Sequence, residues 1–455
     1  MRRDVISAYG ASGARIASWI VVSAVVYRKL GPDDFALLAL IRSTVGLLGY
    51  CAFGIGPAII SRLARADAVT TIDTSVEDGA PIQILPYESK CSVASADSIC
   101  SNGLLAVFAL ALIGLVLAGI YALRIDRIHI LPAPIYPDDA SLLAFTTAAG
   151  ILVRIISDVP GAALQARGRI SLDNLLLLIA DLLWAAGSAI FVIGHRFLPG
   201  VGIALLTGNL VLLSLRFMFA RTGAAVFRKS LFRLEIALDL LGFGSMVVLA
   251  QLADYLYAPT DNILINRLLR PIDVATYAPA VQIDAGLLLL VSGLAAVILP
   301  RAAVAHANEN RQLLGRYYIR GTLFSIAVLL VGSTAVWIAS PWIFLLWFKN
   351  PMPATQAILP LILIHTVVGG SSAVGRSILL GMGKVKPFTT AVLIAGVSNV
   401  LLSWLFVAKF HLGLRGIVLG TIAAVVGRCA LWMPWYVLHS LKNATPAPTT
   451  SDAAL

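Results

Sequence analysis

Two stretches, R-K-L-G-P-D-D-F-A at 28–36 and R-L-L-R-P-I-D-V-A at 267–275, share the pattern R-x-L-x-P-x-D-x-A, and each follows a long apolar run. Proline cannot continue a helix, and it disfavours a helical conformation in the residue before it. Asp34 and Asp273 are placed to cap the next helix or to interact with its positive N-terminal end. The pattern therefore predicts a tight turn between two helices, and the chain contains it twice.

The composition predicts a polytopic membrane protein of the all-α class. Of 455 residues, 59% are hydrophobic and 13% charged, whereas a soluble domain has about 25% charged residues. A helix needs about 20 apolar residues to cross a bilayer. Such stretches predict twelve transmembrane helices, near 6–27, 36–61, 103–123, 141–163, 172–194, 200–219, 238–259, 274–299, 319–340, 355–379, 387–408 and 415–438.

The charge distribution indicates an orientation. The net charge of +11 does not indicate a nucleic-acid surface, because the basic residues are scattered between the spans. With the N-terminus inside, 19 of the 34 Lys and Arg residues fall in inward segments and 10 in outward segments. The positive-inside rule then places both termini in the cytoplasm. The expected location is the plasma membrane, of the bacterial inner-membrane type. No small-residue cleavage site follows the first apolar run, so we expect no cleaved signal peptide.

The repeated turn indicates an internal duplication. Its copies join the first to the second and the seventh to the eighth predicted helix, and "ALQARGRIS" (163–171) and "LLGMGKVKP" (379–387) precede the fifth and the eleventh. An even offset of six helices predicts two parallel six-helix repeats around a central cleft; the alternative is chance recurrence of Gly and Pro in short loops. The predicted organisation is an N-terminal lobe (1–220) with a cytoplasmic insert (66–101), a linker (221–237), a C-terminal lobe (238–442) and a disordered tail (443–455).

The stretch "TDNILINRLLRPIDVATYAPAVQI" (260–283), with "LPRAAVAHANENRQLLGRYYIR" (299–320) and "LLGMGKVKP", resembles the Wzx-type polysaccharide flippases of the multidrug/oligosaccharidyl-lipid/polysaccharide exporter superfamily. The resemblance extends from about residue 10 to 440. The matching positions are Leu30-Gly31-Pro32, Asp261, Tyr277 and Gly383-Lys384. It implies a flippase that moves polyprenyl-diphosphate-linked oligosaccharide from the cytoplasmic to the outer face. Ala36, Ala275 and Arg270 depart from the expected pattern, and the insert at 66–101 is longer than that loop requires.

Charges inside the spans are the candidate site residues, because a charge near mid-bilayer costs about 2.5–3.5 kcal/mol and needs a partner or water. Arg15 and Arg42 have no acid three or four residues away, and a guanidinium fits phosphate oxygens. The substrate-binding candidates are Arg15, Arg42, Arg154 and Arg428. The coupling candidates for H⁺ or Na⁺ are Asp254 first, then Asp284 and Asp181.

Each candidate also has a structural alternative. Arg154 and Asp158, four residues apart on one helix, favour a local ion pair. Arg15 and Arg42 can pair with an acid of another helix such as Asp181. Asp261 is expected near the outer end as a cap or surface group.

No motif indicates catalysis, so we expect no catalytic residue, no metal and no cofactor. His365 lies alone in mid-span, which favours a hydrogen-bonded packing role. Cys51 and Cys429 fall in spans and Cys91 and Cys100 in the inward insert, at a spacing that matches no common metal site.

The leading hypothesis is a flippase for lipid-linked oligosaccharide, working by alternating access as a monomer in the bilayer. A lipid II flippase or a drug/cation antiporter of the same fold stays open as an alternative. A membrane-embedded glycan polymerase or ligase fits less well, because the outward segments are short. The reaction product distinguishes the last class, since an enzyme lengthens the glycan and a flippase changes only its side.

Overall fold

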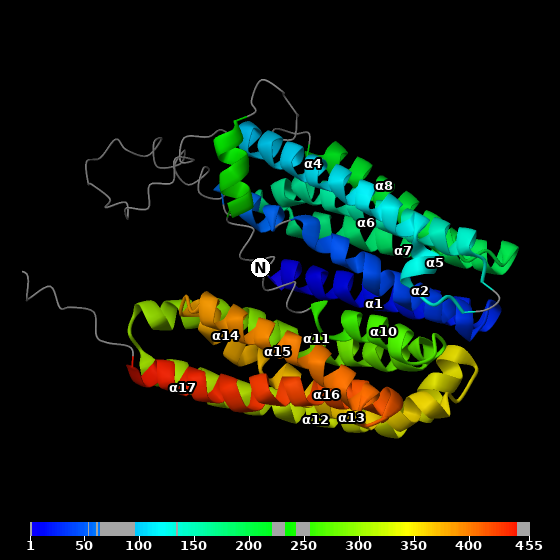
Figure 1. Cartoon of the computed structure of the whole chain (residues 1–455). Helices are drawn as coiled ribbons and strands as arrows, with labels where there is room; N and C mark the ends of the chain where they lie inside the picture. The colour runs from blue at the N-terminus through cyan, green and yellow to red at the C-terminus, as the bar shows by residue number, and fades with distance from the viewer. Residues whose placement is uncertain are drawn as a thin grey trace, which may run out of the picture. The chain divides into compact units, whose positions relative to one another are not determined.

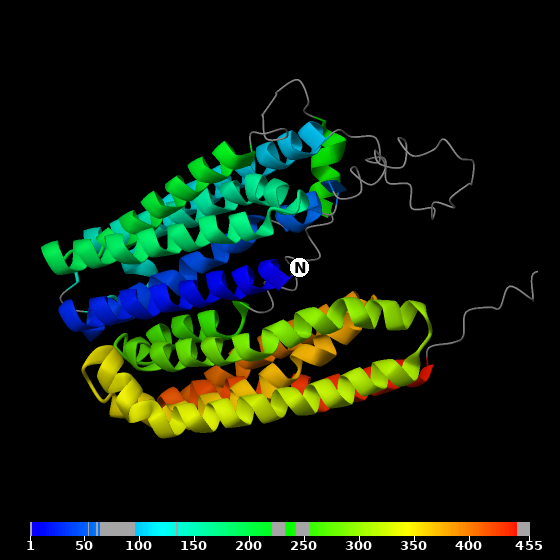
Figure 2. The ribbon, with the colours of Figure 1, turned by 180° about the vertical axis from the view of Figure 1, so that it is seen from behind.

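The computed structural model describes residues 2–52, 54–60, 62–63, 96–132, 135–220, 233–242 and 255–443. Every regular element in these ranges is a helix, and the chain divides into two compact units, Met1–Leu252 and Ala253–Leu455. Figures 1 and 2 show long helices running roughly alongside one another within each unit. The limits predicted for the lobes lie beside residues outside the described ranges and stay a prediction.

The described part of the N-terminal unit contains six long helical segments and short helices at their ends. Within it, α6 packs against α8 and α4, and α7 packs against α1 and α8. Its elements are α1 (Arg2–Lys29), α2 (Pro32–Val45), η1 (Gly46–Ala52), α4 (Ala96–Leu123), α5 (Ile125–Ile128), α6 (Pro137–Ala166), α7 (Ile170–His195), α8 (Gly200–Ala220) and a helix at 234–242.

The C-terminal unit is likewise built of helices packed side by side. The closest packing joins α15 to α16, α11 to α14 and α12 to α13. Its elements are α10 (Ala258–Leu268), α11 (Asp273–Ala307), α12 (Arg311–Phe348), α13 (Pro353–Ser371), α14 (Ala373–Gly381), α15 (Val385–Ala408), α16 (Gly413–Val425), the π-helical η3 (Val426–Trp432) and α17 (Met433–Asn443).

The described residues contain 11 helical stretches long and apolar enough to span a membrane. They correspond to all the predicted spans except the seventh, 238–259, of which residues 243–254 lie outside the described part. The predicted all-α polytopic membrane architecture is therefore confirmed. One boundary was wrong, because α10 continues from Ala258 to Leu268, beyond the predicted end at 259.

Both copies of the opening motif form the predicted turns. In the first, α1 ends at Lys29 and α2 begins at Pro32, and Gly31 between them has a φ of 115°, which favours glycine. In the second, the Arg270 guanidinium lies 2.9 Å from the Asp273 carboxylate. The capping expectation was wrong in detail: Asp34 and Asp273 lie in the first turns of α2 and α11, but neither is the N-cap residue.

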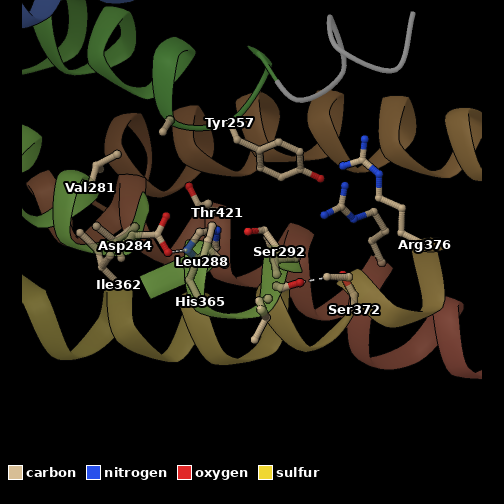
Figure 3. A pocket seen from close by; sticks show the side chains of 18 of the residues that line it. Tyr257, Val281, Asp284, Leu288, Ser292, Ile362, His365, Ser372, Arg376 and Thr421 are labelled. Carbon is tan, nitrogen blue, oxygen red and sulfur yellow. Dashed lines mark hydrogen bonds and ion pairs between the residues drawn. The ribbon is translucent and has the colours of Figure 1, made fainter. Parts of the chain in front are cut away.

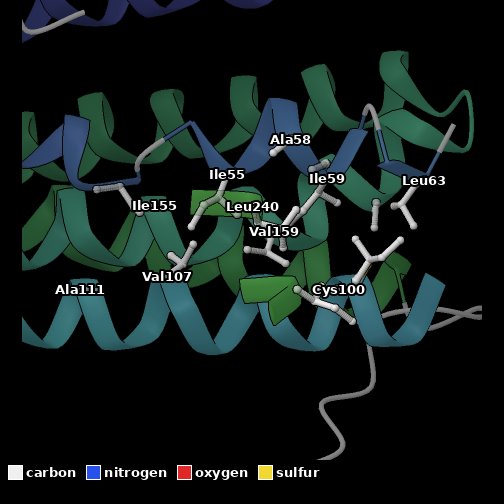
Figure 4. Close-up of a cluster of buried hydrophobic side chains, with 14 of the residues drawn as sticks. Ile55, Ala58, Ile59, Leu63, Cys100, Val107, Ala111, Ile155, Val159 and Leu240 are labelled. Atoms are coloured by element: carbon white, nitrogen blue, oxygen red, sulfur yellow. The ribbon is translucent and has the colours of Figure 1, made fainter. Parts of the chain in front are cut away.

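The helix at 234–242 belongs to the apolar core of the N-terminal unit (Figure 4). Ile236 and Leu240 join a buried cluster with residues of the 55–63 segment, α4 and α6. A 2.6 Å ion pair between Arg62 and Asp239 fixes the same helix from outside the cluster. Cys100 is buried in this cluster within α4, so its expected place in a loop was wrong.

Candidate functional site

The N-terminal unit contains one buried carboxylate between two guanidinium groups. Asp181 of α7 is 5% exposed at its side chain, and it accepts from Arg154 Nη1 at 3.1 Å and from Arg15 Nε at 3.3 Å. The Arg15 side chain is half exposed and that of Arg154 is 24% exposed. One acid thus holds two cations on α1 and α6 while leaving both accessible.

Arg42 lies beside this pair and is held by aromatic rings. Its Cζ is 3.7 Å from the centre of the Trp19 ring, and Trp19 stacks on Trp184 with their centroids 5.8 Å apart. A cation over an indole face gains electrostatic energy without an acid. Arg42 is nevertheless exposed, so its donors stay available.

A second polar cluster lies at the end of α8, and the sequence did not identify it. Arg216 is 2% exposed and bonds Asp173 at 2.8 and 3.1 Å, Asp158 at 2.9 Å and the Ser157 hydroxyl at 2.9 Å. Gly161 makes room for it, since a Cβ there would lie 2.6 Å from Arg216 Cζ. The expected Arg154–Asp158 pair was wrong, because these residues bond to Asp181 and to Arg216 respectively.

The C-terminal unit contains a cavity of about 380 Å³ between α11, α13, α14, α15 and α16 (Figure 3). Polar groups lie at both of its ends. Asp284 and His365 lie at one end and Arg376 at the other, and Tyr257 extends between them. Leu288, Val291, Ile362 and Val418 supply apolar walls.

The acidic end of the cavity depends on neutral donors. Asp284 accepts from the Thr366 hydroxyl at 2.6 Å, and His365 Nδ1 lies 3.7 Å from the same carboxylate. No Lys or Arg forms a salt bridge with Asp284 among the described residues. The interpretation of His365 as a packing residue therefore left out its carboxylate neighbour.

Asp261 is fully buried in α10, so its interpretation as a cap or surface group was wrong. It accepts hydrogen bonds from the Tyr277 hydroxyl at 2.7 Å, the Thr421 hydroxyl at 2.9 Å and the Asn399 amide at 3.0 Å. All three donors are neutral. The sequence analysis ended the predicted helix at residue 259. In the structure α10 continues to Leu268, and Asp261 therefore lies within a helix of the unit.

Arg428 lies in a π-helical stretch, a feature that often marks functional sites. It lines the cavity together with Arg376, and its Cζ is 5.2 Å from the centre of the Tyr257 ring. Arg376 was not among the substrate-binding residues predicted from the sequence. Two guanidinium groups and one carboxylate, that of Asp284, thus line the cavity.

The predicted site residues fall into separate groups. Arg15, Arg42, Arg154 and Asp181 gather in the N-terminal unit, whereas Arg428 and Asp284 line the cavity of the C-terminal unit. Asp254, the first coupling candidate, lies outside the described residues. The described residues contain no cluster of His, Cys, Asp and Glu suited to a metal ion.

Residues 247–405 match the MatE family. The chain is similar to a multidrug resistance MATE family transporter of the MOP superfamily in an inward-facing conformation, with 16% identity, a TM-score of 0.78, and coverage of 94% of this chain and 96% of that one. It is also similar to an outward-facing MATE family transporter of the same superfamily, with 16% identity, a TM-score of 0.66 and 97% of each chain covered.

A third similar structure is that of a MOP superfamily transporter from Pyrococcus furiosus Vc1, whose binding pocket has reverse polarity that suggests a different function. The identity is 16%, the TM-score 0.61, and coverage 97% of this chain and 95% of that one. No curated protein matches the sequence. The chain therefore has the fold of these MATE transporters, and its described residues contain 11 helices long and apolar enough to span a membrane.

Proposed function

We propose that the protein is a flippase that moves polyprenyl-diphosphate-linked oligosaccharide from the cytoplasmic to the outer face of the membrane by alternating access. The observation that carries the proposal is the excess of guanidinium groups around Asp181. Arg15 and Arg154 share this one carboxylate, and Arg42 is held by Trp19 instead of an acid. Such a site favours a substrate with at least two negative charges, as a diphosphate has.

Two further observations support an anionic substrate. Arg376 and Arg428 line the cavity of the C-terminal unit, so both units present guanidinium groups. The similar Pyrococcus furiosus transporter has a binding pocket of reverse polarity. This supports the inference that the fold can accept substrates of different charge. A drug/cation antiporter needs acids rather than arginines at its substrate site.

The test is reconstitution in liposomes with a fluorescent polyprenyl-diphosphate glycan, followed by an impermeant quencher that reports the accessible leaflet. Arg42→Lys should lower the transport rate about tenfold, because the point charge of Lys cannot reproduce bidentate contacts to phosphate. Arg42→Ala should lower it further. Arg270→Lys is the matched control, since this arginine is exposed in the turn before α11 and its guanidinium bonds Asp273.

The outcomes separate the function classes. Export of an organic cation dye without movement of the lipid would support the antiporter alternative and contradict the proposal. Normal lipid transport by both Arg42 variants would remove the role proposed for Arg42. Growth of the glycan on its lipid would indicate a polymerase or ligase.

Ion coupling, where it occurs, is proposed to use a buried acid of the C-terminal unit. Asp284 qualifies because it is bonded by a hydroxyl and lies near His365, so no fixed positive charge neutralises it in the geometry described. Asp284→Asn should abolish the response of transport to an imposed pH or Na⁺ gradient. Asp254→Asn is tested in parallel, and an unchanged response in both variants would contradict coupling through these acids.

A further inference from the structure

A surface groove runs beside the cavity of the C-terminal unit, between α15 and the continuous segment α16–η3–α17. Its volume is about 580 Å³. Small residues form part of its wall, and Trp432, Trp435 and Tyr436 gather near one end. The small residues are Ala391, Ala395, Ala423, Ala424 and Gly427. The groove therefore presents a narrow apolar surface that a thin hydrocarbon chain can contact closely.

Arg428 lines both this groove and the cavity. It is the one charged residue among those that line the groove. Inside the cavity Arg376 adds a second guanidinium, and Asp284 lies at the opposite end (Figure 3). A largely apolar groove and a cavity with polar groups at both ends thus share one cation, Arg428.

The groove also has a defined position along the helices. Its residues on α15 extend from Pro387 to Leu402, and those on the other wall from Ala423 to Tyr436. Lys384 and Lys386 flank the start of α15, and Lys442 lies in the last turn of α17. These lysines mark the cytoplasmic end in the predicted orientation, so the groove lies toward the leaflet in which the lipid-linked glycan is expected.

We propose that this groove binds the polyprenyl chain of the lipid carrier while its diphosphate contacts Arg428 and Arg376 in the adjoining cavity. The inference rests on the proposed flippase function and adds the place where the lipid is first held. Charge complementarity selects the occupant. A diphosphate brings two or more negative charges to two guanidinium groups, and a charge within the bilayer region is most stable beside such a partner.

A second groove in the same unit lacks this combination. It has a volume of about 350 Å³ between α12 and α13, and Leu330, Thr334, Trp337 and Val367 are among its lining residues. None of its lining residues is charged. It can accommodate apolar chains of any bilayer lipid, and so it provides a matched control for the groove at Arg428.

The experiment uses the full-length protein in liposomes with a polyprenyl-diphosphate glycan that carries a diazirine on its first isoprene units. After photolysis, we expect adducts on 387–402 and 423–436. Gly427→Leu should reduce these adducts at least tenfold by filling the groove. A Cβ at Gly427 meets nothing within 4 Å, so the first atom of the new side chain has open space. Thr334→Leu, in the control groove, should leave the adducts unchanged.

Competition identifies what the groove recognises. Excess unlabelled polyprenyl diphosphate should remove the adducts, whereas polyprenol without phosphate and phosphatidylglycerol should not. Arg428→Gln should reduce the adducts while membrane insertion, measured by detergent-solubilised monomer yield, stays normal. Equal competition by phosphatidylglycerol would overturn the proposal and indicate a general lipid site.

The result also separates this inference from the proposed function. Transport at the normal rate by Gly427→Leu, with adducts elsewhere, would overturn the groove and leave the flippase proposal intact. Specific adducts in the groove without any transport of the lipid would support the groove and contradict the flippase proposal. If Gly427→Leu does not give folded protein, Ala391→Leu tests the same point. It fills the groove from the α15 side and should give the same loss of adducts.

Discussion

The two units provide different hydrogen-bond partners for their buried carboxylates. In the N-terminal unit, Asp181 and Asp173 bond guanidinium groups whose charge does not change at physiological pH. In the C-terminal unit, Asp261 and Asp284 accept from hydroxyl and amide groups, with His365 near Asp284. The described buried acids of the first unit thus have guanidinium groups as partners, whereas those of the second have neutral hydrogen-bond donors and one nearby histidine.

The partners of a buried acid determine what it costs that acid to bind a proton or a cation. An acid between two arginines gains little from binding a proton, because protonation leaves the cations without a partner. An acid bonded only by neutral donors can bind a proton or a small cation without breaking an ion pair. Of the two described coupling candidates, Asp284 therefore fits the proposed coupling role, and Asp181 instead holds two of the arginines proposed to bind the substrate.

The largest expected effect comes from breaking the fixed-charge cluster at α8. Arg216→Met should lower the free energy of unfolding by about 3–5 kcal/mol, because it leaves the fully buried Asp173 without its guanidinium. Thermal unfolding in detergent measures the change. The double variant with Asp173→Leu should recover most of the loss, since no buried charge is then unpaired. A small effect of Arg216→Met alone would contradict the fixed-charge interpretation of this unit.

The next effect compares one acid from each unit. Asp181→Asn should lower the free energy of unfolding by about 2 kcal/mol, because it removes the carboxylate shared by Arg15 and Arg154, and the partial exposure of both arginines keeps the loss below that of a fully buried pair. Asp284→Asn should cost about 1 kcal/mol, because one hydroxyl bond is altered and the shape is kept. Chemical denaturation of both variants under the same conditions checks the ratio. Equal losses of unfolding free energy would contradict the difference between the two units.

Much of the fold could be predicted from the sequence, because hydrocarbon thickness imposes a span length that composition reveals directly. The repeated turn likewise marked helix ends, since Pro and Gly act through local backbone geometry. The end of α10 was missed because the polar stretch with Asp261, Asn262 and Asn266 resembles a surface segment. All three residues are buried in the structure.

The site was less predictable, because its partners come from different helices. Arg154 and Asp158 share a helix face in the sequence, yet they bond Asp181 and Arg216, which are 27 and 58 residues away. Helical spacing predicts only contacts within one helix. The pairing of Arg15 with Asp181 was predicted only as an alternative, because spacing along the sequence does not indicate which helices meet. No sequence pattern indicated that Arg42 lies over the ring of Trp19.

The smallest expected signal is a difference between two pH values, which tests whether Asp261 can change its charge. Tyr277→Phe removes the 2.7 Å hydrogen bond to Asp261, while Thr421 and Asn399 still donate to the carboxyl group. A hydrogen bond to a neutral acid contributes about 1 kcal/mol, and one to a charged group about 1.5–3 kcal/mol. The loss of unfolding free energy should therefore be larger at about pH 8 than at about pH 5, if protonation of Asp261 occurs between them. The same substitution in an Asp261→Asn background should show no such pH dependence, because the amide does not titrate. A pH-independent cost in the wild-type background would show that Asp261 keeps one charge state over this range, and it would remove Asp261 from the acids that distinguish the C-terminal unit from the N-terminal unit.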